Sequence, residues 1–173
     1  MKNLKKFVAL LLAGAMAMVM LTACGGGTLT DKQKEEAIQK QLGRKTQATA
    51  LRDNDGKVKN DSQLYKETAE LLDARIKADT SAFGTLAVDF DVDGIDPAKQ
   101  YVTVTLSADY KTAGLVAGFV NLITEKLGKI EDSNNSVKFD TEWAKAAVVV
   151  RTNEKGSYAA IAIQVKNLAY PKT

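Results

Sequence analysis

The segment AKAAVVVRTNEKGSYAAIAIQVK, residues 144–166, decides the fold class of this chain. It contains two apolar runs, 144–152 and 157–166, on either side of Asn153-Glu154-Lys155-Gly156. A short polar segment with Asn and Gly between two apolar runs is typical of a β-hairpin turn. The segment therefore predicts two antiparallel strands that form the centre of a sheet.

The second of these strands has two different faces. Ile161, Ile163 and Val165 alternate with Ala160 and Ala162, and alternate side chains of a strand point to opposite faces. One face is therefore bulky and the other small. Because neither face is polar, we expect helices to cover both.

Upstream, two further stretches alternate between apolar and polar residues, as half-buried strands do. They are separated by the turn-forming residues 93–97, so we expect them to pair as a hairpin with a long loop. In the first, the apolar side is Leu86, Val88, Phe90 and Val92, and in the second it is Val102, Val104 and Leu106.

Two segments have the spacing of amphipathic helices. The first follows Asn60-Asp61-Ser62, any of which can cap a helix, and the second runs over residues 111–127 to Gly128. The second carries a strip of small residues, which predicts a close approach to the alanine face of the strands. The strip is Ala113, Gly114, Ala117 and Gly118.

We therefore predict a single α+β domain over residues 61–170. Its element order is α-β-β-α-β-β, with the helices packed on an antiparallel or mixed four-stranded sheet. Residues 24–60 are polar, and we expect a tether and one marginal helix over 31–42, then loop. Thr30 with Gln33 forms a capping-box pattern for that helix, and Gly43 is placed to end it.

The N-terminus has the three parts of a secretory signal. Lys2, Lys5 and Lys6 precede an apolar run over residues 7–21, and Leu21-Thr22-Ala23-Cys24 follows. This motif resembles the lipobox of bacterial lipoprotein precursors. The resemblance implies that residues 1–23 are a signal peptide that is removed. It also implies that Cys24 becomes the acylated first residue and anchors the protein to the membrane, on the extracytoplasmic side. The alternative is an ordinary signal peptide with an incidental cysteine.

Composition then excludes several classes of function. Removal of residues 1–23 takes three lysines from the 24 basic residues and leaves them equal to the 21 acidic ones, so the strongly basic surface of a nucleic-acid-binding protein is not expected. The chain has no histidine, and Cys24 is its only cysteine. These counts exclude Ser-His-Asp and Cys-His catalysis, His/Cys metal centres and an intrachain disulfide. We expect no cofactor, with calcium as the one exception considered next.

Asp89, Asp91, Asp93 and Gly94 match the first half of an EF-hand calcium loop. The twelfth position is Gln100 rather than a bidentate Glu. The alternative is that Asp89 and Asp91 are solvated acids on one face of a strand, with Asp93 and Gly94 in a turn. Both interpretations stay open.

Other residues allow weaker functional hypotheses. Carboxylate chemistry on a glycan needs two acids across a cleft, and Glu125, Asp140 and Glu142 are available together with Asp89 and Asp91. We expect Trp143 to lie in the core. The aromatic candidates for a binding patch on the sheet are Tyr101, Tyr110, Tyr158 and Phe139.

The leading interpretation is a lipid-anchored, non-catalytic binding or cell-envelope module for an unknown protein or glycan ligand. One alternative is a small carboxylate-dependent enzyme that acts on a cell-wall or glycan substrate. Another is a calcium-stabilised extracellular module.

Overall fold

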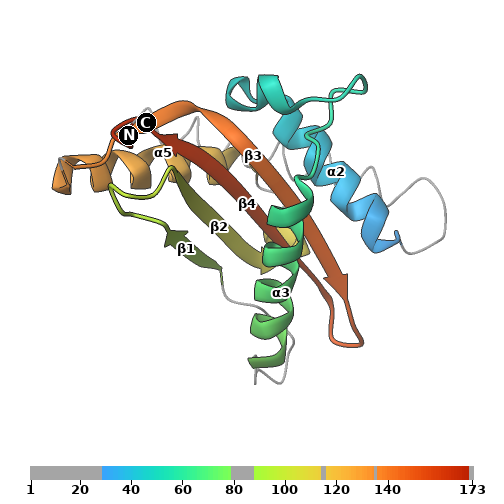
Figure 1. Ribbon diagram of the computed structural model, residues 1–173. Coiled ribbons are helices and arrows are strands. Elements are labelled where there is room, and N and C mark those ends of the chain that lie inside the picture. The colour runs from blue at the N-terminus through green and yellow to red at the C-terminus, as the bar shows by residue number, and fades with distance from the viewer. Residues whose placement is uncertain (1–28, 79–87, 114–115, 135, 172–173) are drawn as a thin grey trace, which may run out of the picture.

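The structure is a computed structural model that describes residues 29–78, 88–113, 116–134 and 136–171. It confirms the α+β class and a single domain built on one four-stranded antiparallel sheet (Figure 1). The strands are β1 Asp89–Asp93, β2 Tyr101–Asp109, β3 Phe139–Thr152 and β4 Ser157–Asn167. Their order across the sheet is β1-β2-β4-β3.

The predicted hairpin of residues 144–166 forms the long β3–β4 pair. Val148 lies opposite Ile161, and Thr152 lies opposite Ser157 beside the turn. The Asn153 amide donates to the Gly156 carbonyl at 2.9 Å, and the Asn153 side chain accepts from the Lys155 and Gly156 amides. The turn residues therefore close the hairpin as the sequence predicts.

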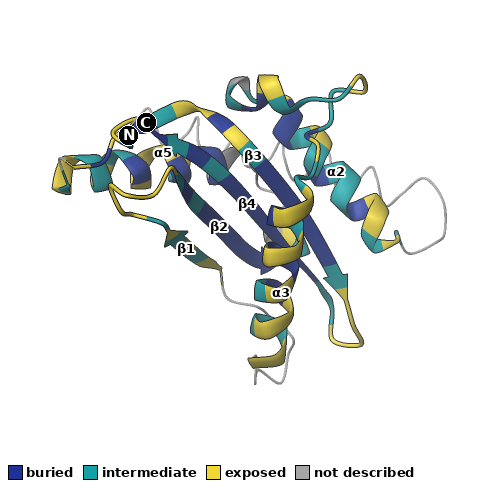
Figure 2. Ribbon diagram, viewed as in Figure 1, coloured by how far each residue is buried: buried dark blue, intermediate teal, exposed yellow. Residues whose placement is uncertain are grey.

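Helices lie on both faces of the sheet, in the predicted order. The helix α3, Ser62–Ala78, is followed by β1 and β2, then by the short α4, Tyr110–Ala113, and by α5, Val116–Ser133, before β3 and β4. The strands beneath the helices are almost wholly buried, whereas β1 at one edge is half-exposed (Figure 2).

The bulky face of the sheet forms the larger part of the core. Ile161 and Ile163 of β4 pack there with Phe119 and Ile123 of α5. Leu127 of α5 also packs in this core, and Ile130 packs against it. This packing continues beyond Gly128, so α5 ends at Ser133 and not at the glycine.

The alanine face is covered by α3, which corrects our expectation that the later helix would lie there. Leu64 packs on Ala147 and Ala162, and Leu72 packs with Val149 and Ala160. Small side chains on the sheet admit large leucines from α3. The side chains of the small strip at 113–118, that of Ala113 included, lie outside the described residues.

Residues 29–60 are part of the folded domain and not only a tether and loop. The helix α2, Asp31–Gly43, has the predicted capping box at Thr30 and Gln33, and its Ile38 and Leu42 are fully buried in the main core. A 3-10 helix, η1, Thr46–Leu51, follows and buries Ala48. Burial of these few apolar residues outweighs the polar composition of the segment.

Candidate functional site

Strand β3 lies at an edge of the sheet, and its outward backbone amides bond to side chains of α2. The Thr152 amide donates to Asp31 Oδ2 at 3.1 Å, and the Val150 amide donates to Glu35 Oε1 at 2.9 Å. Four residues of helix advance about 6 Å, close to the roughly 6.6 Å spanned by two residues of a strand. Carboxylates at i and i+4 of α2 therefore match alternate amides of β3.

Asn60 and Asp61 continue this pairing along the same edge. The Asn60 side chain accepts from the Val148 amide at 2.8 Å and donates to the Val148 carbonyl at 3.3 Å, as a neighbouring peptide group would. The Asp61 amide donates to the Ala146 carbonyl at 2.9 Å. We call Asp31, Glu35, Asn60 and Asp61 the edge cap. An edge whose backbone groups are already bonded cannot recruit another strand.

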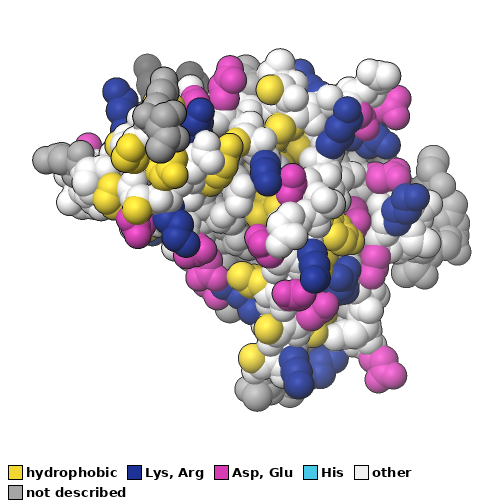
Figure 3. Space-filling view, in the orientation of Figure 1, with side chains coloured by type: hydrophobic (Ala, Val, Ile, Leu, Met, Phe, Trp, Pro, Cys, Tyr) yellow, Lys and Arg dark blue, Asp and Glu magenta, His cyan; other side chains and the backbone are white. Residues whose placement is uncertain are grey.

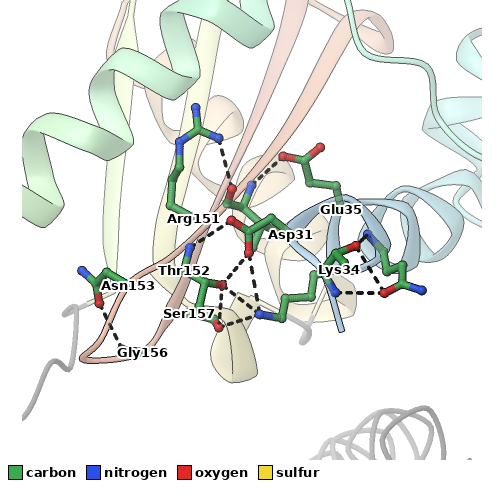
Figure 4. Close-up of polar contacts among 11 residues, drawn as sticks. Asp31, Lys34, Glu35, Arg151, Thr152, Asn153, Gly156 and Ser157 are labelled. Carbon is green, nitrogen blue, oxygen red and sulfur yellow. Dashed lines mark hydrogen bonds and ion pairs between the residues drawn. The ribbon is translucent and has the colours of Figure 1, made fainter. Parts of the chain in front are cut away.

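A buried lysine ties α2 to the hairpin beside the edge cap (Figure 4). Lys34 Nζ donates to Thr152 Oγ1 at 2.8 Å and to Ser157 Oγ at 2.7 Å, and it lies 3.7 Å from Asp31 Oδ1. The Thr152 hydroxyl donates in turn to Asp31.

The contact between Lys34 and Ser157 has the spacing of a nucleophile and its general base. A base must carry a lone pair, however, and the surroundings of Lys34 are oxygen acceptors with a carboxylate among them. Lys34 Nζ is the donor to the Ser157 hydroxyl, and this contact joins α2 to the β3–β4 hairpin.

Glu35 also joins α2 to α3. Tyr65 Oη of α3 donates to Glu35 Oε1 at 3.0 Å, the same oxygen that accepts from Val150. Burial raises the pKa of Tyr65, and the neighbouring Glu35 carboxylate reinforces this rise against the opposing effect of Arg151. Tyr65 therefore remains a protonated donor in the neutral pH range, and one carboxylate holds three elements together.

The predicted calcium ligands lie beside an arginine. Arg75 of α3 contacts Asp89 at 2.8 Å and also bonds to Asp91 and to the Ser107 hydroxyl. Asp93 ends β1, and Gly94 turns the chain with φ of +84°. Asp89 and Asp91 share one face, as predicted, and the guanidinium group occupies the position between them. No cluster of three or more metal-ligating side chains is present within the described residues.

The predicted aromatic patch is not assembled on the sheet surface. Tyr158 and Phe139 are buried in the core, and Tyr110 is half-buried near Lys34. Tyr101 at the start of β2 is also half-buried. Trp143 is buried in the core, as expected.

Two of the other carboxylates considered for glycan chemistry, those of Glu125 and Asp140, have contacts within the protein. Glu125 bonds to Lys129 at 2.6 Å on an exposed helix face, and the Lys129 ammonium lowers the pKa of Glu125. Asp140 accepts from the Glu142 amide at 3.1 Å. A general acid in a glycosidase needs a raised pKa, and that of Glu125 moves in the opposite direction.

The remaining predicted site residue, Cys24, lies outside the described residues. Within the described ranges, no helix has the length and apolar character needed to cross a bilayer. No protein family, curated protein or solved structure matches this chain.

Sequence reasoning missed the edge cap and Lys34. The spacing of Asp31 and Glu35 places them on one face of a helix, but the same pattern occurs on many solvated helices. The partners of these residues lie about 120 residues further along the chain, as with Asp31 and Thr152, and no local pattern indicates such a contact.

Proposed function

We propose that this protein is a lipoprotein anchored to the membrane through Cys24, with an extracytoplasmic domain that acts as a non-catalytic binding or cell-envelope module. The motif Leu21-Thr22-Ala23-Cys24 after a basic and apolar leader carries the proposal. Two acyl chains hold a protein on a membrane far more firmly than the single chain that gives reversible binding.

The contacts of the described polar residues support a role without catalysis. Asp31, Lys34 and Glu35 are bonded within the junction of α2 and β3, and Arg75 contacts both Asp89 and Asp91. Groups that are committed to holding elements together are poor candidates for proton transfer. Such a domain would serve by presenting a surface to a protein or glycan ligand.

The anchor is tested by mass spectrometry of the protein isolated from bacterial membranes. We expect the mature chain to begin at Cys24 with a thioether-linked diacylglyceryl group and to partition into a detergent phase. The Cys24→Ser variant should lack this mass and remain in the aqueous phase. A wild-type chain with a free Cys24 thiol would refute the proposal.

A further inference from the structure

We infer that the outer edge of β1 is a docking site for an extended segment of a partner protein, which adds to the four-stranded sheet as a further strand. The segment alternates apolar and basic side chains. Docking at β1 rests on the proposed non-catalytic binding role, to which it gives a surface and a partner chemistry. It does not depend on the acylation of Cys24.

The hydrogen-bond register of the sheet shows which backbone groups of β1 face outward. The Asn167 amide donates to the Gln100 carbonyl at 2.8 Å, and the residues that bond to a given neighbour alternate along an antiparallel strand. The even-numbered residues of β2 therefore bond to β4, and its odd-numbered residues bond to β1. The partners of these odd-numbered residues are the three aspartates of β1, so Phe90 and Val92 direct their amides and carbonyls away from β2.

The two edges of the sheet differ in how such outward groups are bonded. On β3, the edge cap bonds to backbone groups over residues 146–152. On β1, the Phe90 amide donates to the side chain of its neighbour Asp89 at 2.8 Å. Within the described residues, the outward amide and carbonyl of Val92 carry no corresponding bond. An edge with free backbone groups is a template for another strand.

The apolar side chains of this edge are incompletely covered. Val88 lies one residue before β1 and continues the alternation of Phe90 and Val92. Phe90 and Val92 pack against the main core but stay half-exposed. Val88 is 58% exposed, more than any other large apolar side chain of the described residues. This row continues the apolar core beyond the last strand, and a strand with apolar side chains on the same face would bury it.

The opposite face of β1 is acidic. It presents Asp89, Asp91 and Asp93, and Figure 3 shows acidic side chains in a row along the edge of the molecule where β1 lies. Arg75 contacts the first two, whose side chains nevertheless remain 56% and 51% exposed. Asp93 is exposed at the end of the strand. The carboxylates of this face thus outnumber the one guanidinium group that contacts them.

The two faces of β1 define the side chains of the added strand. Residues directly opposite one another in neighbouring strands have Cβ atoms about 4.5–5.5 Å apart, and opposite charges there are favourable. Basic side chains would therefore lie beside the aspartates, and apolar ones beside the row of Val88, Phe90 and Val92. Lys126 already lies over the Phe90 ring, so the apolar face does not favour further basic side chains. A second copy of this chain fits less well, because β1 paired with β1 would bring aspartates together.

The test uses a synthetic peptide of alternating lysine and valine, blocked at both termini, and the membrane-isolated protein in neutral detergent micelles. NMR titration measures the dissociation constant of the peptide, and hydrogen exchange reports on the Val92 amide. We expect the bound peptide to slow exchange of this amide by more than about tenfold. A control peptide of the same composition, with lysines and valines in separate blocks, should bind at least about tenfold more weakly.

Two methylated peptides separate backbone pairing from charge attraction. In an antiparallel pair, the residues opposite Phe90 and Val92 direct their amides toward β1, and in the proposed alignment these are the valines. Methylation of the valine amides should therefore weaken binding by more than about tenfold, whereas methylation of the lysine amides should be tolerated. Equal binding of the two methylated peptides, or tighter binding of the methylated-valine peptide, would refute this pairing.

Protein variants locate the site on β1. Asp93→Lys should weaken binding by about three- to tenfold, because an attraction across the strands becomes a repulsion. The matched control, Glu154→Lys, makes the same change of charge in the exposed β3–β4 turn and should leave binding unchanged. Equal weakening by both substitutions would reduce the binding to general charge attraction and refute the site.

Different results would refute the β1 site and the proposed function. A peptide that does not bind, or that binds without protecting the Val92 amide, refutes docking at β1 and leaves the anchor untouched. Protection of Val92 that rises with protein concentration and needs no peptide would assign the edge to a second copy and overturn the proposal. A free Cys24 thiol refutes the anchor and has no bearing on binding of the peptide.

Discussion

Gly43 lies where the end of α2 passes against the backbone of Gly56. A Cβ atom built on Gly43 would lie 1.9 Å from the Gly56 carbonyl oxygen. Glycine is required at this position because a side chain would not fit between the end of α2 and the backbone of Gly56. Gly43 ends α2 as the sequence predicts, but it is the last residue of the helix and is not among the described glycines with positive φ.

Gly43→Ala should destabilise the domain by about 1–3 kcal/mol, because the backbone of α2 or of Gly56 must move. Gly128→Ala is the control, since a Cβ atom built on Gly128 meets no described atom within 4 Å, and replacing glycine by alanine within a helix stabilises the helix by about 1 kcal/mol. Urea unfolding should therefore show opposite shifts in midpoint for the two variants. Equal shifts would contradict the close approach.

Arg75 bears on the predicted calcium site, because it contacts both Asp89 and Asp91. A calcium ion would have to displace a guanidinium group that already satisfies these acids. We expect the melting temperature of the wild-type protein to stay the same when millimolar calcium is added. A ligand that binds only the native state must raise it, so an increase would favour the calcium-stabilised module.

At the scale of elements, the start of α3 depends on Asp61. Asp61 Oδ1 accepts from the Leu64 amide at 3.0 Å, and Lys145 lies 3.4 Å from Oδ2. The Leu64 amide, opposed in part by burial and reinforced by Lys145, lowers the pKa of Asp61. The ionised form is therefore the one that stabilises the folded state.

Asp61→Asn keeps an N-capping oxygen but removes the charge, so it should cost about 0.5–1 kcal/mol at neutral pH. Because the pKa of Asp61 is lower in the folded state than in the unfolded state, its charge contributes its full stabilisation at pH values above the unfolded-state pKa. This contribution is lost as the pH falls through the folded-state pKa. The difference in unfolding free energy between wild type and variant should thus vanish in strong acid. A difference that stays constant from pH 7 into strong acid would contradict a role for the charge.

The edge of β3 depends on Glu35 in the same way that α3 depends on its cap. Glu35→Ala should leave the Val150 amide without its acceptor and cost about 1–3 kcal/mol. Native-state hydrogen exchange at Val150 should accelerate. Glu36→Ala, on the next residue of α2, is the control and should leave this amide protected. Equal exchange in both variants would show that the edge cap does not protect β3.

At the scale of the molecule, the two faces of the sheet are covered by different helices. The alanines of β4 face the leucines of α3, and the isoleucines face the aromatic and aliphatic residues of α5. Small residues on the strands thus leave room for large residues on α3, while bulky residues of the strands pack directly against α5.

Ala162→Leu would place a larger side chain against Leu64, where both residues are buried. Overpacking of this kind should cost about 1–3 kcal/mol. Ile163→Leu on the opposite face conserves volume and should cost less than about 1.5 kcal/mol. Thermal unfolding that ranks the two variants in the reverse order would argue against α3 as the cover of the alanine face.

The sequence by itself determined the α+β class, the order of the elements and the hairpin of β3 and β4. It did so because alternation, helical spacing, caps and turn residues are local patterns whose cause lies within a few neighbouring residues. The polar composition of residues 31–60 led us to expect a marginal helix and loop outside the domain, because a local pattern does not indicate contacts with distant strands. The few buried residues there, Ile38 and Leu42 above all, contact strands more than 60 residues away.

Only the tertiary structure decided which helix covers which face, how the edge of β3 is capped, and that Arg75 lies between Asp89 and Asp91. Each of these depends on contacts between residues distant in sequence, such as Glu35 with Val150, which form only when the whole sheet is assembled. The proposal that Cys24 carries a lipid anchor likewise rests on a local motif, Leu21-Thr22-Ala23-Cys24.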